Sequence, residues 1–236
     1  MKLLLFSNST NAGEPYLGYT LPFIKSFIDN KPVKALFIPY AGVSINWDDY
    51  YTMVKEQLVK TGIELEAIHH FNDPVSAVDS ADMIIVGGGN TFNLLKTIQD
   101  NDLVPVIQKK VLSGTPYIGW SAGSNLACPT IRTTNDMPVV EPDSFEALGL
   151  IPFQINPHYL DANPDGHAGE TREMRIEEFM IANPDMYVAG LRESTMLLLE
   201  NNELKLQGER TCRVFKHNIP ITELTANDDL SFLLDV

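Results

Sequence analysis

The chain has 236 residues, of which 44% are hydrophobic and 20% charged, a composition typical of a globular protein and unlike that of a disordered one. Its formal net charge of −14 disfavours binding to nucleic acid or to an anionic membrane surface. Two cysteines, Cys128 and Cys212, are too few for a disulfide scaffold, and Cys and His residues show no zinc-finger spacing. Since no signal peptide or membrane-spanning run is recognisable, we expect a cytoplasmic protein.

Short apolar runs alternate with amphipathic segments through the first half of the chain. The expected strands are residues 2–6, 33–39, 63–69, 83–86 and 117–120, and the expected helices are residues 17–28, 48–60, 74–80, 93–99 and 104–112. Strands that alternate with helices indicate a parallel sheet covered on both faces. We therefore expect one α/β domain over residues 1–236, with a doubly wound, mostly parallel sheet.

The second half of the chain has a different character. Residues 129–157 contain five prolines and few helical signals, which predicts an irregular excursion with short strand pieces. Residues 172–181 return to a helical pattern, with Thr171 as the expected N-cap. From Tyr187 onward the sequence favours antiparallel β-structure, and Asn201-Asn202 is expected to form a hairpin turn.

The strongest functional signal is the sequence Gly119-Trp120-Ser121-Ala122-Gly123, which follows an apolar strand and precedes helix formers. This Gly-x-Ser-x-Gly pattern is typical of a nucleophile elbow, where a sharp strand-to-helix turn exposes the serine hydroxyl. Small flanking residues allow chain segments to pass closely, and the helix N-terminus favours developing negative charge. The pattern also occurs by chance, so its placement between strand and helix is the feature that favours catalysis.

A second signal is the run Gly87-Gly88-Gly89-Asn90-Thr91 directly after the strand at 83–86. Glycines at the carboxyl end of a strand expose backbone N–H groups that can line an oxyanion hole or hold a phosphate. The alternative interpretation is a tight turn that leads into a capped helix. The spacing matches neither a dinucleotide-binding fingerprint nor a P-loop.

A serine nucleophile requires a general base. Among the five histidines, His158 ends a strand-like segment and is favoured over His167, which lies in a glycine-containing loop. Position in the sequence does not decide which carboxylate would orient the base. The candidates are Asp136, Glu141, Asp143 and Glu193.

Several segments of the chain resemble the peptidase E family of α-aspartyl dipeptidases. The longest runs from Tyr117 to Pro138 and contains the elbow and Asp136. The others are residues 5–10, 37–43, 84–92, 154–158 and 166–173. The resemblance spans nearly the whole chain and weakens after about Leu191.

This resemblance implies a fold similar to that of class I glutamine amidotransferases, of the flavodoxin-like type, with a C-terminal antiparallel β extension. It also implies a serine peptidase that cleaves dipeptides with an N-terminal aspartate. Ser121 matches the family's nucleophile, His158 its base and Asp136 its acid, and Glu193 matches a glutamate proposed as an alternative acid. The oxyanion hole corresponds to the backbone N–H groups of Gly89 and Ala122.

The substrate carboxylate needs local positive charge in so acidic a protein. Arg172 is the first candidate, because it begins a helix with a threonine N-cap, and Arg132 is the second. The alternative is that Arg172 forms an ordinary surface ion pair. Thr10 and Asn90 each follow a strand and are expected to line the crevice at the carboxyl ends of the sheet.

Two other functions compete with the dipeptidase. Cyanophycinases share the fold and the elbow but cut a branched aspartate–arginine polymer, and a non-catalytic module could keep the pocket to bind a small molecule. We expect small peptides as the partners, no nucleic acid, no membrane, no metal and no cofactor. The expected assembly is a monomer or a homodimer.

Overall fold

The computed structural model describes residues 1–163, 166 and 168–235, so His167 lies outside the described residues. Its larger sheet has seven strands in the order β3-β2-β4-β5-β1-β8-β9. They are β1 (Lys2–Phe6), β2 (Val33–Ile38), β3 (Ile63–Ala67), β4 (Ile84–Val86), β5 (Tyr117–Trp120), β8 (Thr195–Glu200) and β9 (Glu203–Gly208). The first five in chain order are parallel, as their separation by helices predicts.

The C-terminal hairpin extends this same sheet. Strand β8 pairs antiparallel with both β1 and β9. Asn201 and Asn202 join β8 to β9 with φ of 54° and 62°, the left-handed conformation that a tight hairpin turn requires and that asparagine tolerates. The expected Asn-Asn hairpin is therefore confirmed.

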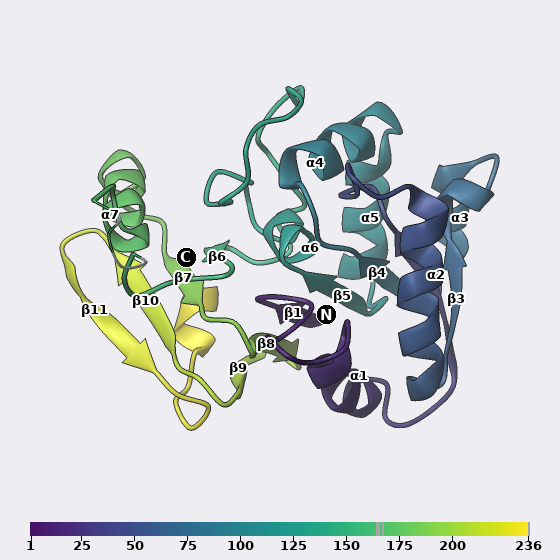
Figure 1. Cartoon of the computed structure of the whole chain (residues 1–236), viewed down its shortest axis with the longest axis horizontal. Coiled ribbons are helices and arrows are strands. Elements are labelled where there is room, and N and C mark those ends of the chain that lie inside the picture. Colours follow the sequence, from purple (N-terminus) through teal and green to yellow (C-terminus); the bar gives the residue numbers. More distant parts are fainter. Residues whose placement is uncertain (164–165, 167, 236) are drawn as a thin grey trace.

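Helices cover both faces of the larger sheet (Figure 1). On one face, α1 (Leu21–Phe27) and α2 (Trp47–Leu58) pack through Ile24, Phe27, Val54 and Leu58. On the other face lie α3 (Pro74–Ser80), α4 (Thr91–Asp100), α5 (Leu103–Leu112) and α6 (Ala122–Leu126). Because alternate residues of the strands enter the two clusters, the sheet is buried on both sides, which confirms the doubly wound α/β expectation.

A second sheet lies beside the first and has the order β11-β10-β7-β6 (Figure 1). Its strands are β6 (Gln154–Asn156), β7 (Val188–Leu191), β10 (Cys212–Lys216) and β11 (Ile219–Leu224). Strands β6 and β7 are parallel, whereas the other pairs are antiparallel. Helix α7 (Arg172–Ala182) packs on this sheet through Ile176 and Met180, and Thr171 caps it by accepting a hydrogen bond from the Met174 amide.

Most expected elements are offset by no more than one or two residues at an end, and in two places the chain forms a 3-10 turn that was not expected. The helix expected over 17–28 is a 3-10 turn, η1 (Gly18–Thr20), followed by α1, because Leu17 adopts a left-handed φ of 55°. The strand expected to reach His69 ends at Ala67, and the chain turns through η3 (Ile68–His70). Two further 3-10 turns are η2 (Val59–Thr61) and η4 (Ser231–Leu234).

Among the described residues, no helix is both long enough and apolar enough to cross a membrane.

Candidate active site

Ser121 occupies the sharp turn between β5 and α6. Its φ of 53° and ψ of −110° lie in a region that side-chain-bearing residues rarely adopt, at a typical cost of about 1–3 kcal/mol. The Ser121 amide donates to the carbonyl of Phe6, 3.1 Å away at the end of the neighbouring strand β1. The hydroxyl is thus presented at the carboxyl edge of the sheet, as the elbow pattern predicts.

The two glycines of the elbow are required by close backbone approaches. A Cβ added to Gly119 would lie 2.5 Å from the carbonyl oxygen of Gly123, and one added to Gly123 would lie 2.3 Å from that of Val86. Both distances are far shorter than any real Cβ contact. The glycine spacing therefore follows from the packing of α6 against β4 and β5.

His158 lies at the carboxyl end of β6 in the second sheet and faces the serine. Its Nε2 is 3.0 Å from Ser121 Oγ, and its Nδ1 is 2.8 Å from Glu193 Oε1. Both distances are within hydrogen-bond reach, so one imidazole can accept the serine proton while the carboxylate holds the opposite ring nitrogen. Glu193 follows β7, the strand that pairs with β6.

Asp136 occupies a different position from the one expected for the orienting acid. Its Oδ2 accepts hydrogen bonds from the Thr91 amide at 2.7 Å, the Thr91 hydroxyl at 2.5 Å and the Thr134 hydroxyl at 3.0 Å. The carboxylate beside the imidazole is Glu193. This corrects the expectation from the resemblance, because spacing along the chain does not report which strand ends meet.

Ser7 joins the strands that carry the histidine and the glutamate. Its hydroxyl donates to the Leu191 carbonyl at 2.8 Å and accepts from the His158 amide at 2.9 Å, and its side chain is fully buried. One residue further, Asn8 Oδ1 accepts from the Ser194 amide at 2.9 Å. Ser7 has no motif around it that indicates a function, although its position directly after β1 places it at the same sheet edge as Ser121.

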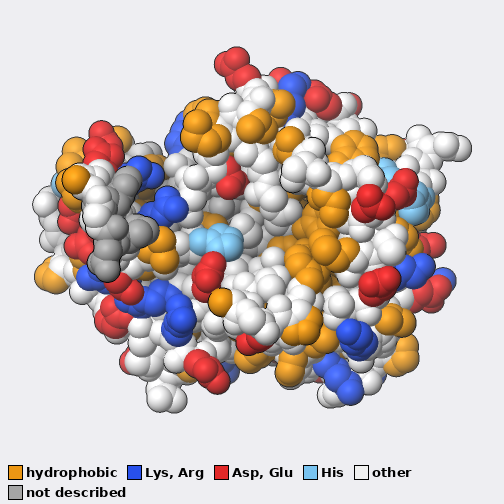
Figure 2. Space-filling view, in the orientation of Figure 1, with side chains coloured by type: hydrophobic (Ala, Val, Ile, Leu, Met, Phe, Trp, Pro, Cys, Tyr) orange, Lys and Arg blue, Asp and Glu red, His pale blue; other side chains and the backbone are white. Residues whose placement is uncertain are grey.

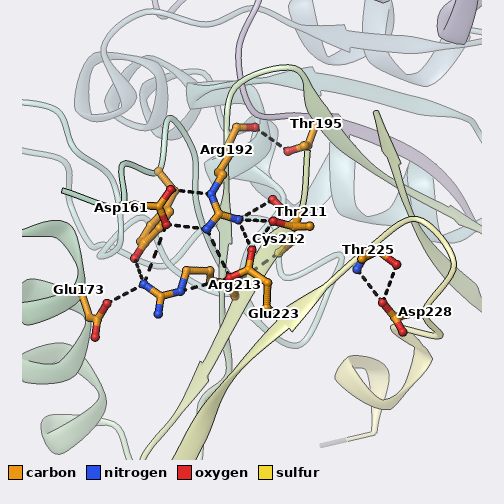
Figure 3. A network of polar contacts seen from close by, with 11 residues as sticks. Asp161, Glu173, Arg192, Thr195, Thr211, Cys212, Arg213, Glu223, Thr225 and Asp228 are labelled. Atoms are coloured by element: carbon orange, nitrogen blue, oxygen red, sulfur yellow. Dashed lines mark hydrogen bonds and ion pairs between the residues drawn. The ribbon is translucent and has the colours of Figure 1, made fainter. Parts of the chain in front are cut away.

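A network of ion pairs fixes the chain on either side of the histidine and the glutamate (Figure 3). Arg192, which precedes Glu193, donates to Asp161 at 2.5 and 2.8 Å and also to Glu223. Hydrogen bonding to Asp161 is the main cause that raises the pKa of Arg192. Arg213 donates to Glu173 at 2.6 Å. The two arginines therefore hold both ends of the connection between β6 and α7.

The expected oxyanion donors lie near the serine. Gly89 has a φ of +135°, and a Cβ added there would lie 2.3 Å from the Ala41 carbonyl oxygen, so only glycine fits. Ala122 is the first residue of α6, where an amide has no partner within the helix. Within the described part of the chain, neither amide donates a backbone hydrogen bond, so both are free to bind an oxyanion.

A cavity of about 530 Å³ opens in front of Ser121. It is lined by Gly88, Gly89, Asp136 and His158, and also by aromatic and aliphatic groups, namely Tyr16, Val43, Ile45, Tyr50, Met53 and Trp120. Figure 2 shows this face hollowed near its centre, with a histidine beside acidic groups on one flank and hydrophobic side chains on the other. The cavity thus combines polar and apolar lining groups.

A smaller cavity of about 230 Å³ adjoins the first at Asp136 and is lined by Arg132, Arg172 and Arg175. Burial and the nearby Arg175 lower the pKa of Arg172, whereas Asp136 raises it. The structure thus places Arg172 close enough to Asp136 for an electrostatic interaction, and among the described residues it forms no ion pair at the surface. In an acidic protein this is a local concentration of positive charge.

The other two residues expected at the substrate have different surroundings. Asn90 lines the larger cavity, but its side chain is engaged: Oδ1 accepts from the Asn93 amide at 3.0 Å, and Nδ2 donates to the Met137 carbonyl at 2.8 Å. In the loop after β1, the residue that lines the cavity is Ser9 rather than Thr10.

A strained serine after a parallel strand, with an imidazole and a carboxylate in line, defines an α/β serine hydrolase. Comparison with known proteins gives the family. The model of peptidase family S51 matches residues 3–207, and the chain belongs to this family.

The relatives are similar over nearly their full lengths. A protein named peptidase E from Nostoc sp. is 47% identical over 99% of this chain and 97% of its own. Another protein of that name, from Salmonella paratyphi A, is 49% identical over 92% of this chain and 94% of its own. The resemblance to the peptidase E family and the expected hydrolase class are thereby confirmed.

Two solved structures support the fold. A crystal structure of a putative peptidase E protein from Listeria monocytogenes has a TM-score of 0.66 at 21% identity and covers 88% of this chain and 98% of its own. A peptidase from an acI-B1 Actinobacterium has a TM-score of 0.69 at 22% identity, over 98% of this chain and 96% of its own.

Proposed function

We propose that this protein hydrolyses dipeptides with an N-terminal aspartate, and that Ser121, His158 and Glu193 form its catalytic triad. The observation that carries the proposal is the line from Ser121 Oγ through the imidazole to Glu193 Oε1, beside a cavity that leads to an arginine cluster. Membership of peptidase family S51 and the peptidase E name of relatives at 47–49% identity support the substrate class.

In the first half of the reaction, His158 Nε2 accepts the hydroxyl proton as Ser121 Oγ attacks the scissile carbonyl. Glu193 accepts a hydrogen bond from Nδ1–H, which fixes the ring tautomer and stabilises the imidazolium. The amides of Gly89 and Ala122 donate to the oxyanion. The tetrahedral intermediate collapses when the imidazolium protonates the leaving amine, which leaves an aspartyl ester on Ser121.

In the second half, a water molecule takes the place of the departed amine. His158 removes its proton as the water oxygen attacks the ester carbonyl. The second tetrahedral intermediate collapses with return of the proton to Ser121 Oγ, and free aspartate leaves. This cycle requires the imidazole to stay within reach of both the serine and the incoming water, which the half-exposed His158 side chain permits.

The two charged groups of the N-terminal aspartate need two different partners. For the side-chain carboxylate we propose Arg172, which is partly buried and lines the smaller cavity together with Asp136. For the free ammonium group we propose Asp136, which lines the main cavity and whose three described hydrogen bonds all go to Oδ2. This assignment gives Asp136 a binding role in place of the orienting role expected from the resemblance.

The leaving residue would lie on the apolar side of the cavity. Tyr16, Ile45 and Met53 offer a surface that suits an aliphatic or aromatic side chain without a specific polar contact. We therefore propose strict selection of the first residue of the dipeptide and broad tolerance of the second.

The test is a panel of matched peptides assayed in the presence of EDTA. Asp-Leu should be cleaved fastest, and Asn-Leu, Glu-Leu, Leu-Leu and N-acetyl-Asp-Leu should each have a kcat/KM lower by about 10²-fold or more, because each lacks or misplaces one charged group. Cleavage of Leu-Leu at the rate of Asp-Leu would contradict the proposal. Cleavage of aspartyl polymers alone would favour the cyanophycinase-like alternative.

A further inference from the structure

Far from the nucleophile, three potential metal ligands from two separate segments meet at the surface. Asp48 lies in the first turn of α2, and His69 and His70 end the 3-10 turn after β3, 21 and 22 residues further along the chain. Their ligand atoms all lie within 4.8 Å of one another. Figure 2 shows histidine and acidic side chains together at the edge of the molecule where Figure 1 places α2 and β3.

Both imidazoles direct Nε2 at the same carboxylate oxygen. Asp48 Oδ1 is 3.0 Å from His69 Nε2 and 2.7 Å from His70 Nε2. Ligands at about 2.0–2.1 Å from a tetrahedral zinc ion are about 3.3 Å apart, so the His69 contact would open by about 0.3 Å and the His70 contact by about 0.6 Å. The ion would then replace two N–H···O hydrogen bonds with three bonds to metal.

Packing holds both imidazole rings in this orientation. The His69 ring lies 5.7 Å from that of Trp47, the His70 ring meets the edge of Tyr51 at 5.2 Å, and the two imidazoles are 4.4 Å apart. The Nδ1 of His69 is buried and has no hydrogen-bond partner among the described residues, which leaves Nε2 as its available ligand atom. Because the rings are already ordered, metal binding would cost little conformational entropy.

We propose that Asp48, His69 and His70 form a binding site for one zinc-class transition-metal ion, with solvent completing the coordination. Two imidazoles and one carboxylate favour zinc, cobalt, nickel or copper over magnesium or calcium, which prefer oxygen ligands. A second carboxylate in the same helical turn, Asp49, adds negative charge that offsets the unfavourable effect of the helix N-terminus on a cation.

Occupancy of this site would join α2 to the connection between β3 and α3. Helix α2 also carries Tyr50 and Met53, which line the catalytic cavity, and the Tyr50 hydroxyl donates to the Gly88 carbonyl at 2.9 Å. The expected consequence is a more stable wall of the cavity, with no metal in the reaction. An ion that binds only the folded chain stabilises it, and the melting temperature rises with the logarithm of the ion concentration relative to Kd.

The site is tested by titrating EDTA-treated, dialysed protein with zinc chloride in a calorimeter. We expect one ion per chain with a Kd of about 10 μM or tighter and an increase in melting temperature. Asp48→Asn and His70→Gln should each weaken zinc binding by at least about tenfold, because each removes one of three ligands. Both side chains lie at the surface, and circular dichroism confirms that the variants fold.

Two control variants separate this site from other imidazoles. His158→Gln removes the pair formed with Glu193, and His217→Gln removes a histidine next to the turn between β10 and β11; zinc affinity should be unchanged in both. Titration with cobalt chloride gives a second readout through the visible absorption of four-coordinate Co²⁺. The proposal is overturned if the native protein binds zinc no more tightly than Asp48→Asn/His70→Gln. None of these readouts depends on peptidase activity.

Discussion

The two halves of the catalytic site are held in position by different forces. On both sides of Ser121 the chain is buried, and Gly119 and Gly123 pack against neighbouring backbone with no space for larger groups. His158 and Glu193, by contrast, have side chains that are 40% and 44% exposed, and polar contacts hold them from the second sheet. Packing thus fixes the nucleophile rigidly, whereas hydrogen bonds worth about 1 kcal/mol each position the base.

Substitution of Ser121, in the buried half of the site, should have the largest effect on kcat. Ser121→Ala is expected to lower kcat by at least about 10⁴-fold, because no other group can form the acyl-enzyme. Ser121→Gly should do the same and also be more stable than Ser121→Ala by about 1 kcal/mol, since glycine adopts the elbow conformation without strain. Peptide hydrolysis and thermal unfolding measure the two effects. Turnover retained by either variant would exclude Ser121 as the nucleophile.

The second prediction separates the two carboxylates near the site. Glu193→Gln should lower kcat by about 10²- to 10⁴-fold with little change in KM, because it removes the acceptor that stabilises the imidazolium. Asp136→Asn should mainly raise KM for Asp-Leu, because the proposed partner of the ammonium group is lost. The opposite pattern, with kcat lost only in Asp136→Asn, would restore Asp136 as the orienting acid.

Arg172 tests whether the arginine cluster selects the substrate. Arg172→Ala should lower kcat/KM for Asp-Leu by about 10²-fold and leave the low rate on Asn-Leu nearly unchanged, because only the charged substrate loses an ion pair. Arg172→Lys is the matched control that keeps the charge without the planar fork, and it should recover part of the activity. An equal loss on both peptides in Arg172→Ala would indicate a structural role.

The smallest expected effect concerns Ser7, which joins the two halves. Ser7→Ala removes the acceptor of the His158 amide and the donor to the Leu191 carbonyl, so the base should be less well positioned. We expect kcat to fall by about tenfold while KM for Asp-Leu stays constant. A lower melting temperature with unchanged kcat would mean that Ser7 serves stability alone.

Local sequence patterns predicted much of the larger sheet. The helix over residues 74–80 and the strand over residues 117–120 have the expected bounds. A proline at the first position marks the helix, and a short buried run marks the strand, so both signals are local in the sequence. The irregular excursion with short strand pieces was also expected, and it holds a bridge between Thr130 and Glu146 as well as the short strand β6. The sequence predicted the second sheet only as antiparallel structure near the C-terminus. It did not predict β6 in that sheet, because β6 pairs in parallel with β7 and is separated from it in the chain by α7.

The sequence by itself predicted the strand-to-helix elbow that carries Ser121, because the steric demands of the elbow fall on residues 119–123 and are visible as small side chains at fixed spacing. It did not determine which carboxylate orients His158. That choice depends on β6 and β7 lying side by side and on Ser7 bonding to a residue 184 positions away. The proximity of Asp48 to His69 and His70 likewise depends on two segments that are distant in the chain. Contacts between distant segments leave no local pattern, so only the tertiary structure decided them.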